Sequence, residues 1–199
     1  MTEPWDVGID LDGCVYDFID AIRKEVCLNY PHLDPSTPAE SWTFYERWGL
    51  SHDVFLNVYA TSVKEGRVLW EGEPYPGTVE AWQRLADAGH RIHVITDRRP
   101  AGAVADAQRA TISWLAQHGL NYSSITFSPD KTLIRHLASH EDRVVFVDDK
   151  AENFRALQST GINAFLMDRP WNQHAEGPRV ASLHDFAARV DQLTQGVTF

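Results

Sequence analysis

Two carboxylates lie two residues apart near the start of the chain, at the end of a short apolar run. Val7 to Ile9 belong to that run, and Asp10 and Asp12 follow it. Alternate side chains of a strand point the same way, so both carboxylates should project to one side of the strand end. Their charges repel unless a cation lies between them or one of them holds a proton. A divalent metal with oxygen ligands is the usual partner; the alternative is an Asp-Gly turn that faces water.

Polar groups also end or follow three later apolar segments. Ligands of open parallel sheets bind beyond the carboxyl ends of the strands, so these groups should share one edge. They add carboxylates, a hydroxyl and an ammonium to the first pair, a set that suits a phosphate bound with a divalent cation. The groups are Thr96 and Asp97 at 91–97, Lys131 after 125–127, and Asp148 and Asp149 after 144–147.

Each of these groups also has a simpler structural interpretation. Thr96 could cap a helix, and Asp148 with Asp149 could cap the helix that follows them. Lys131 could be an ordinary solvated lysine. The occurrence of all the groups in order, each at a strand end, favours the chemical interpretation over a joint coincidence.

Other charged residues receive no role in the chemistry. Asp17 is expected to cap the helix that follows it. Arg98 and Arg99 either reach a phosphate or a partner, or lie exposed on the surface, and exposure is at least as good an interpretation. The histidines show no spacing typical of a zinc site.

The spacing of apolar residues predicts the elements that must position these groups. Helical spacing predicts helices at 18–28, 54–59, 79–86, 104–115, 133–137 and 154–157, and apolar runs predict strands at 7–9, 91–96, 125–127, 144–147 and, as the last strand, from 164. Strands and helices alternate from Gly77 onward, which predicts an α/β fold with a doubly wound, Rossmann-like parallel sheet covered on both faces.

The segment between the first strand and Gly77 has a different texture. It carries Pro31, Pro35 and Pro38 and a dense group of aromatic residues. We expect a small helical cap at 18–76, inserted after the first strand into a core made of 1–17 and 77–199. The cap aromatics Trp42, Phe44, Tyr45 and Trp48 are weak candidates for a substrate pocket, because packing of a small cap is the better interpretation.

The bulk composition excludes several classes of protein. The chain has 199 residues, of which 43% are hydrophobic and 23% charged, as in an ordinary globular domain. A net charge of −10 argues against binding to nucleic acid or to an anionic membrane. No apolar run could span a bilayer and no signal peptide is evident. Cys14 and Cys27 are expected to be free thiols, and the cytoplasm is the expected location.

The four groups, taken in order, resemble the motifs of the haloacid dehalogenase (HAD) superfamily of phosphohydrolases. The segment Asp10 to Asp17 is similar to its first motif, Thr96 to the second, Lys131 to the third, and the pair Asp148-Asp149 to the fourth. Within the superfamily the chain looks most like the 5′-nucleotidases and 5′(3′)-deoxyribonucleotidases, because 147–153 and the Pro-Trp-Asn segment within 166–172 resemble theirs.

The resemblance implies a role for each matching residue. Asp10 would be the nucleophile that forms an aspartyl-phosphate, and Asp12 would be the general acid and base. Mg²⁺ would be held by Asp10, by the Asp12 backbone carbonyl and by Asp148 or Asp149, with Asp149 favoured as the direct ligand.

Binding of the phosphoryl group falls to the remaining residues of the resemblance. Thr96 and the backbone N–H of Asp97 would donate hydrogen bonds to it, and Lys131 would neutralise it. Trp171 and Asn172 either line the pocket or close a turn.

The expected function is hydrolysis of a small phosphorylated metabolite, most of all a nucleoside 5′-monophosphate. Two alternatives stay open: the same chemistry on a sugar phosphate or a nucleic-acid end, and a non-catalytic binding protein that kept the fold. Dehalogenation is disfavoured, because Asp12 would then have no task.

Overall fold

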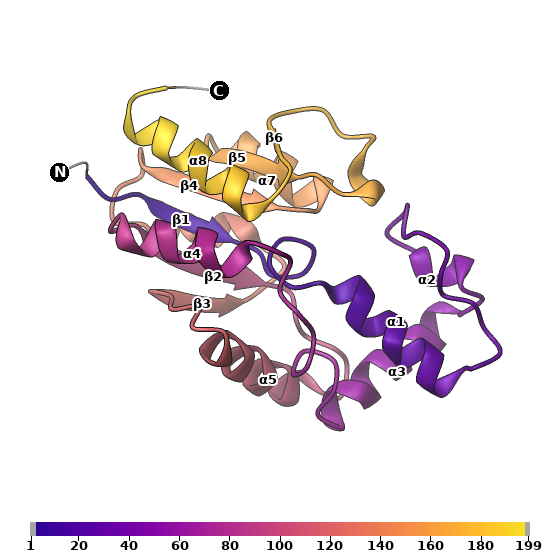
Figure 1. The fold of residues 1–199 in the computed structure, drawn as a ribbon. Coiled ribbons are helices and arrows are strands. Elements are labelled where there is room, and N and C mark those ends of the chain that lie inside the picture. The colour runs from indigo at the N-terminus through magenta and orange to yellow at the C-terminus, as the bar shows by residue number, and fades with distance from the viewer. Residues whose placement is uncertain (1–2, 198–199) are drawn as a thin grey trace.

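The computed structural model describes residues 3–197, which form one six-stranded, all-parallel sheet of order β3-β2-β1-β4-β5-β6 (Figure 1). The strands are β1 (Asp6–Ile9), β2 (Arg91–Thr96), β3 (Ser124–Phe127), β4 (Val144–Asp148), β5 (Asn163–Met167) and β6 (Arg179–Val180). The helices are α1 (Phe18–Asn29), α2 (Phe44–Arg47), α3 (His52–Lys64), α4 (Thr78–Asp87), α5 (Val104–Gln117), α6 (Ile134–Leu137), α7 (Ala151–Ser159) and α8 (Leu183–Thr194), with 3₁₀ turns η1 (Lys131–Leu133) and η2 (Pro170–Asn172). The predicted α/β fold with a parallel sheet is confirmed.

Both faces of the sheet are buried, which explains why its strands are apolar runs rather than alternating sequences. Successive residues of β4 belong to opposite layers: Val145 and Val147 pack in the core beneath α4, α5 and α8, and Val144 and Phe146 pack in the core beneath α6 and α7. A glycine in β1 permits the second layer to close on the sheet. A Cβ at Gly8 would lie 2.1 Å from the ring of Phe146.

Strand order brings the predicted groups to one place. β1 lies between β2 and β4, so the residues that follow these three parallel strands emerge side by side. The chain leaves β1 toward β2 and β3 on one side, and it returns to β4 and β5 on the other. Such a reversal opens a crevice at the carboxyl ends of the strands, where ligands of open α/β sheets bind.

Helices α1, α2 and α3 lie together to one side of the sheet, beyond the end of β1 (Figure 1). The side chain of Asp17 accepts a hydrogen bond from the Asp20 amide at 3.1 Å and caps α1, as predicted. Helix α3 packs against α5 of the main body. We call residues 18–76 the cap; their division from the rest as a separate domain stays a prediction.

The opposite, amino-terminal edge of the sheet holds a buried polar network around Asp6. Its carboxylate accepts two hydrogen bonds from Arg91, both 2.7 Å, one from His93 at 2.8 Å, and one from the Ser139 amide at 2.9 Å. His93 also bonds Ser124 at 2.7 Å. Every bond of this network joins adjacent strands or a neighbouring loop, so it fastens β1, β2 and β3 together.

Some elements differ from the expectation. The strand that begins near 164 is not the last, because β6 and α8 follow it. With two residues, β6 is too short to show an alternating pattern. Both cysteines are free thiols, as predicted, with Cys14 buried and Cys27 exposed. Across residues 3–197, no helix has the length and apolar character needed to cross a membrane.

Candidate active site

Asp10 and Lys131 form a buried ion pair just beyond the end of β1. Lys131 Nζ lies 2.8 Å from Asp10 Oδ1 and donates a second hydrogen bond to the Ile95 carbonyl at 2.6 Å. Lys131 is only 3% exposed, which rules out a solvated lysine. Burial lowers the pKa of Lys131, but the charges of Asp10 and Asp148 outweigh burial and raise it. The η1 turn thus delivers a fixed positive charge to the strand ends.

Three carboxylates converge beside this ion pair. Oxygen atoms of Asp10, Asp148 and Asp149 all lie within 4.8 Å of one another, and all three residues are buried. Burial and the neighbouring Asp10 raise the pKa of Asp148 to about 7. Burial and the charge of Asp148 also raise the pKa of Asp149 well above its usual range. Such a set of hard oxygen donors with unfavourable mutual repulsion is suited to a divalent cation.

The two adjacent aspartates have different surroundings. Asp148 accepts hydrogen bonds from the Lys150 amide at 2.8 Å and from Asn153 Nδ2 at 3.0 and 3.1 Å, so both of its oxygens are occupied. Asp149 accepts one side-chain hydrogen bond, from the indole N–H of Trp171 to Oδ2 at 2.9 Å. Asp149 therefore has the more available oxygen atoms of the two.

The Pro-Trp-Asn turn positions Asp149. Both interpretations of this segment hold, because one residue closes the turn and the other lines the pocket. Asn172 is buried and donates to the backbone carbonyls of Asp149 and Met167, each at 2.7 Å, so it closes the turn against the strand end. Trp171 lines the cavity next to the site while it bonds Asp149.

Gly13 is required by the close approach of Asp149. It has φ +76°, and a Cβ there would lie 2.1 Å from Asp149 Oδ2. Its carbonyl accepts a hydrogen bond from Arg169 Nε at 2.7 Å, which ties the loop after β1 to the loop after β5. Only glycine can adopt this positive φ without strain and also leave room for the carboxylate of Asp149.

Thr96 ends β2 with a buried hydroxyl that has no hydrogen-bond partner within residues 3–197. Helix α5 begins at Val104, so Thr96 does not cap it. A buried hydroxyl without a partner is costly unless a ligand completes it. Asp97 follows it, exposed, with its carboxylate paired to Arg99 at 2.7 Å.

The carboxylate of Asp12 lies apart from the acidic cluster and is held by Arg98. The guanidinium Nη2 lies 2.6 Å from Asp12 Oδ1, and Nε lies 3.1 and 3.0 Å from the two carboxylate oxygens. The side chain of Arg98 is 0% exposed. The interpretation of Arg98 as a surface residue is therefore wrong, whereas Arg99 is exposed. Burial alone would lower the pKa of Arg98, but the charge of Asp12 raises it.

A cavity of about 300 Å³ opens between these groups and the cap. Asp12, Asp97, Asp149 and Trp171 line it from the main body. Of the four candidate aromatics of the cap, three line it: Trp42, Phe44 and Tyr45.

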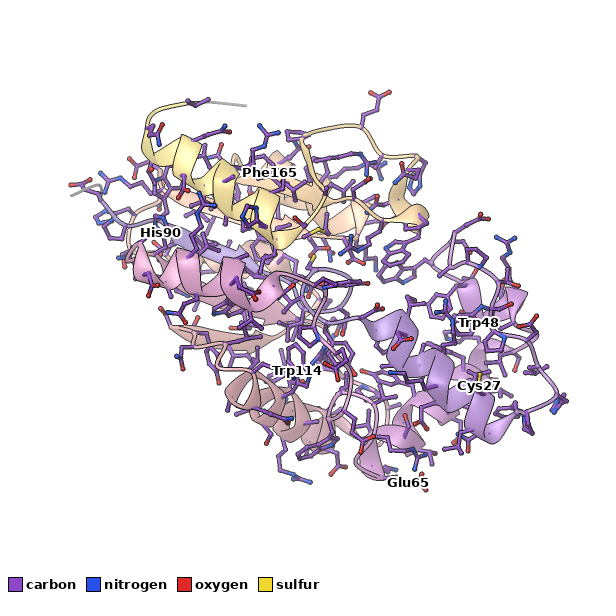
Figure 2. The ribbon with its side chains drawn as sticks, in the orientation of Figure 1. Cys27, Trp48, Glu65, His90, Trp114 and Phe165 are labelled. Atoms are coloured by element: carbon purple, nitrogen blue, oxygen red, sulfur yellow. The ribbon has the colours of Figure 1, made fainter. Side chains whose placement is uncertain are left out.

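Trp48 is not among the described residues that line the cavity. It lies within the helices of the cap (Figure 2), is 2% exposed, and donates its indole N–H to the Thr37 carbonyl at 2.9 Å. Trp42 is its opposite: the ring is half exposed, and Lys150 Nζ lies 5.1 Å from its centroid. Trp48 thus packs the cap, and Trp42 faces the cavity.

Sequence reasoning missed part of the cavity wall. One face of α3 contributes four residues at the helical spacing i, i+3, i+4 and i+7, namely His52, Phe55, Leu56 and Tyr59. His52 Nδ1 lies 2.8 Å from the Tyr45 hydroxyl, which gives this apolar wall a polar pair. The sequence predicted a helix at 54–59, but which of its faces lines the cavity depends on how the cap packs against the main body.

Comparison with known proteins decides the family. The family model described as "5′ nucleotidase, deoxy (Pyrimidine), cytosolic type C protein" matches residues 4–193. The chain belongs to this family. As a member, it is a 5′-nucleotidase-like phosphoric monoester hydrolase of the HAD superfamily, and the resemblance found in the motifs is confirmed.

Individual relatives agree with the family. A protein of Chlorobaculum tepidum named "Putative 5′(3′)-deoxyribonucleotidase" is 28% identical over 90% of this chain and 86% of its own length. A "Putative nucleotidase" of Bacillus cereus is 24% identical over 88% and 92%. Among solved structures, the L-2-haloacid dehalogenase of Xanthobacter autotrophicus has a TM-score of 0.63 with 14% identity, over 98% of this chain and 100% of that one. That likeness concerns the fold alone.

Proposed function

We propose that this protein is a magnesium-dependent phosphatase that hydrolyses nucleoside or deoxynucleoside 5′-monophosphates through an aspartyl-phosphate on Asp10. One observation carries the proposal: the buried hydroxyl of Thr96, which has no hydrogen-bond partner among the described residues, ends the strand beside β1, where Asp10 is paired with Lys131. A nucleophile, a fixed cation and a hydroxyl that needs an acceptor at adjacent strand ends are the groups that a phosphoryl group requires.

The acidic cluster fits a magnesium ion. Asp10 and Asp149 would supply carboxylate oxygens and the backbone carbonyl of Asp12 a third ligand, while Asp148, held by the Lys150 amide and Asn153, would add its negative charge beside them. When bound, Mg²⁺ neutralises charge on the phosphoryl oxygens and on the carboxylates. The raised pKa values of Asp148 and Asp149 support this assignment, because they reflect buried carboxylates whose mutual repulsion the charge of Lys131 does not fully offset.

The chemistry has two steps. In the first, Asp10 attacks phosphorus, the bond between phosphorus and the sugar oxygen breaks, and Asp12 donates a proton to the departing alkoxide. In the second, Asp12 takes a proton from water, the water oxygen bonds to phosphorus, and the bond to Asp10 breaks. Inorganic phosphate leaves, and both aspartates return to their starting states.

Three groups stabilise the phosphoryl group during both steps. Lys131 offsets the charge of the phosphoryl group and that of Asp10, from the position that its ion pair with Asp10 defines. The hydroxyl of Thr96 and the backbone N–H of Asp97 donate to its oxygens. Such preorganised donors typically contribute about 10²–10³-fold each to the rate.

The cavity supports a nucleotide as substrate. Its wall is largely aromatic, with Trp42 half exposed and Trp171 facing it from the main body. Flat aromatic rings can stack on a nucleobase. The Chlorobaculum tepidum relative is named for deoxyribonucleotides, which agrees with this choice. Two free cysteines agree with a reducing compartment, and we assign the protein to the cytoplasm.

The first experiment is phosphate release from a panel of nucleoside 5′-monophosphates and sugar phosphates, with magnesium and with a chelator. We expect release from the 5′-monophosphates that stops when the chelator is added. Release from sugar phosphates alone would refute the nucleotide assignment and keep the mechanism. Phosphate release that the chelator does not change would refute the magnesium dependence. No release at all would favour a binding protein that kept the fold.

The covalent step has its own test. Asp10→Asn keeps the volume of the side chain and removes the nucleophile, so we expect kcat to fall by about 10⁴-fold or more with the fold retained. Acid-quenched wild-type enzyme should carry a phosphoryl group on the peptide that contains Asp10. Near-wild-type rates in Asp10→Asn would refute the aspartyl-phosphate.

A further inference from the structure

We infer that Arg98 is a positioning residue that sets the orientation of the Asp12 carboxylate in the site. The inference rests on the proposed function, in which Asp12 moves the proton. Arg98 lies outside the described lining of the cavity, so it acts through Asp12 rather than on the substrate.

The contact between the two side chains has two points. Arg98 Nη2 and Nε both donate to Asp12 Oδ1, at 2.6 and 3.1 Å, whereas within the described part of the chain Oδ2 accepts only from Nε, at 3.0 Å. A planar guanidinium in this arrangement fixes the plane of the carboxylate as well as its distance. Oδ1 is therefore occupied, and Oδ2 is the oxygen with room to exchange a proton with the substrate or water.

Arg98 is itself fixed from two other sides. Its Cζ lies 4.5 Å from the centroid of the Tyr16 ring, and its Nη1 donates to Thr111 Oγ1 at 3.3 Å. Thr111 donates its own hydroxyl proton to the Ala107 carbonyl at 2.7 Å, so its oxygen is oriented to accept. Because these partners come from the loop after β1 and from α5, the guanidinium has little freedom to rotate.

Tyr16 is equally immobile. Its hydroxyl accepts a hydrogen bond from the Leu69 amide at 2.9 Å, and its ring packs edge-on to Trp114 with centroids 5.1 Å apart. Trp114, labelled on α5 in Figure 2, donates its indole N–H to the Gly72 carbonyl at 2.6 Å. The support of Arg98 therefore extends to Leu69 and Gly72, in the irregular segment that returns the chain from the cap to α4.

Burial explains why Asp12 keeps this orientation. A fully buried guanidinium is strongly unfavourable unless a partner accepts its hydrogen bonds, and Asp12 Oδ1 accepts two of them even when Oδ2 carries a proton. Asp12 is the one carboxylate recorded within ion-pair distance of Arg98 among the described residues, and its side chain is 28% exposed. If Asp12 turned away toward solvent, Arg98 would be left buried and unpaired. Asp12 is thus held at the wall of the cavity with one face open to it.

The test compares Arg98→Lys with wild type on a 5′-monophosphate and on p-nitrophenyl phosphate. Lysine keeps the charge but loses the two-point contact, so Asp12 should lose its fixed plane. We expect kcat on the nucleotide to fall by about 10²-fold, as for a misplaced catalytic group, with KM changed less than about threefold.

A substrate with a better leaving group distinguishes a misplaced Asp12 from general structural damage to the active site. Nitrophenolate departs without a proton, so the first step on p-nitrophenyl phosphate does not need Asp12. The second step, hydrolysis of the aspartyl-phosphate, still does. Arg98→Lys should therefore show a burst of about one nitrophenolate per enzyme, followed by slow turnover. Equal loss on both substrates with no burst, or a KM rise that accounts for the whole loss, would overturn the inference.

Two variants complete the experiment. Arg99→Lys is the matched control, because Arg99 is exposed and adjacent, and its kcat should equal that of wild type. Thr111→Val removes one support of Arg98 at nearly constant volume, and it should lower kcat in the same direction by about three- to tenfold. Thr111→Val also tests the inference on its own if Arg98→Lys does not fold. A Thr111→Val enzyme with an unchanged kcat would count against the inference.

Two further measurements keep this test separate from the proposed function. In the Asp12→Asn background, Arg98→Lys should cause no additional loss; a further loss of tenfold or more would show an effect that bypasses Asp12. Absence of activity in wild type would refute the proposed function, not the positioning. In that case crystal structures decide: an Asp12 carboxylate that keeps its orientation in Arg98→Lys overturns the inference.

Discussion

The indole N–H of Trp171 donates a hydrogen bond to Asp149 Oδ2 at 2.9 Å, while the same side chain lines the cavity. One residue thus contacts the acidic cluster and the space proposed for the substrate. The backbone of the Pro-Trp-Asn turn is anchored independently by Asn172, so the ring can be altered without loss of the turn.

This contact predicts a specific effect on metal binding. Trp171→Phe keeps a ring at the cavity wall but removes the N–H that orients Asp149. We expect the magnesium concentration for half-maximal activity to rise by about tenfold or more, as for other groups that orient metal ligands, with kcat largely recovered at high magnesium. Trp42→Phe is the control, because it alters an indole of the same cavity, and its magnesium dependence should match wild type. A Trp171→Phe enzyme with unchanged magnesium dependence would refute the role of the hydrogen bond.

The acidic cluster predicts the pH dependence of stability in the absence of metal. Burial and mutual repulsion raise the pKa of Asp148 from 3.8 to about 7 and raise the pKa of Asp10 and Asp149. The folded state therefore binds more protons than the unfolded state between these values, so the free energy of unfolding falls as the pH rises from about 4 to about 7.

The measurement is thermal melting with chelator at pH 5 and pH 8. We expect the melting temperature to be lower at pH 8 by at least a few degrees, and magnesium to restore it. Asp149→Asn isolates the effect, because it removes one of the repelling charges and should flatten the dependence. If wild type and Asp149→Asn lose stability equally between the two pH values, the cluster is not the cause.

The Asp6 network predicts the opposite dependence at acid pH. Burial would raise the pKa of Asp6, but hydrogen bonds from Arg91, His93 and Ser139 lower it to about 2. Its contribution is therefore complete above its ordinary value of 3.8 and is lost as the pH falls through about 2.

Asp6→Asn should remove that contribution without touching the chemistry. We expect the free energy of unfolding at pH 7 to fall by about 3 kcal/mol, as when one partner of a buried ion pair is removed. The kcat of the folded variant should stay at the wild-type value, because the network lies at the amino ends of the strands. Urea unfolding and phosphate release measure the two quantities, and a large fall in kcat would contradict the separation.

Two tryptophans of the cap should respond in opposite ways to truncation. Trp48→Ala removes a fully packed ring, so we expect a loss of about 3–5 kcal/mol in the free energy of unfolding. Trp42→Ala removes a half-exposed ring at the cavity, so stability should barely change while KM for the nucleotide rises by about tenfold. Melting curves and KM values of both variants test this. Unchanged KM in Trp42→Ala would exclude stacking on the base.

The sequence by itself determined the parallel α/β fold and which groups meet at its edge. Each of these inferences depends on local pattern: an apolar run ends where a polar residue begins, and parallel strands align their carboxyl ends. The sequence alone therefore assigns Asp10, Lys131 and the pair Asp148-Asp149 to one crevice.

Only the tertiary structure decided which side chains are covered and what they contact. Arg98 and Arg99 are adjacent and chemically identical, yet one is buried against Asp12 and the other is exposed, because only one of them points toward Tyr16 and α5. Trp42 and Trp48 differ in the same way. Periodicity describes one element at a time, whereas burial depends on the neighbouring layer, which is contributed by residues distant in the sequence.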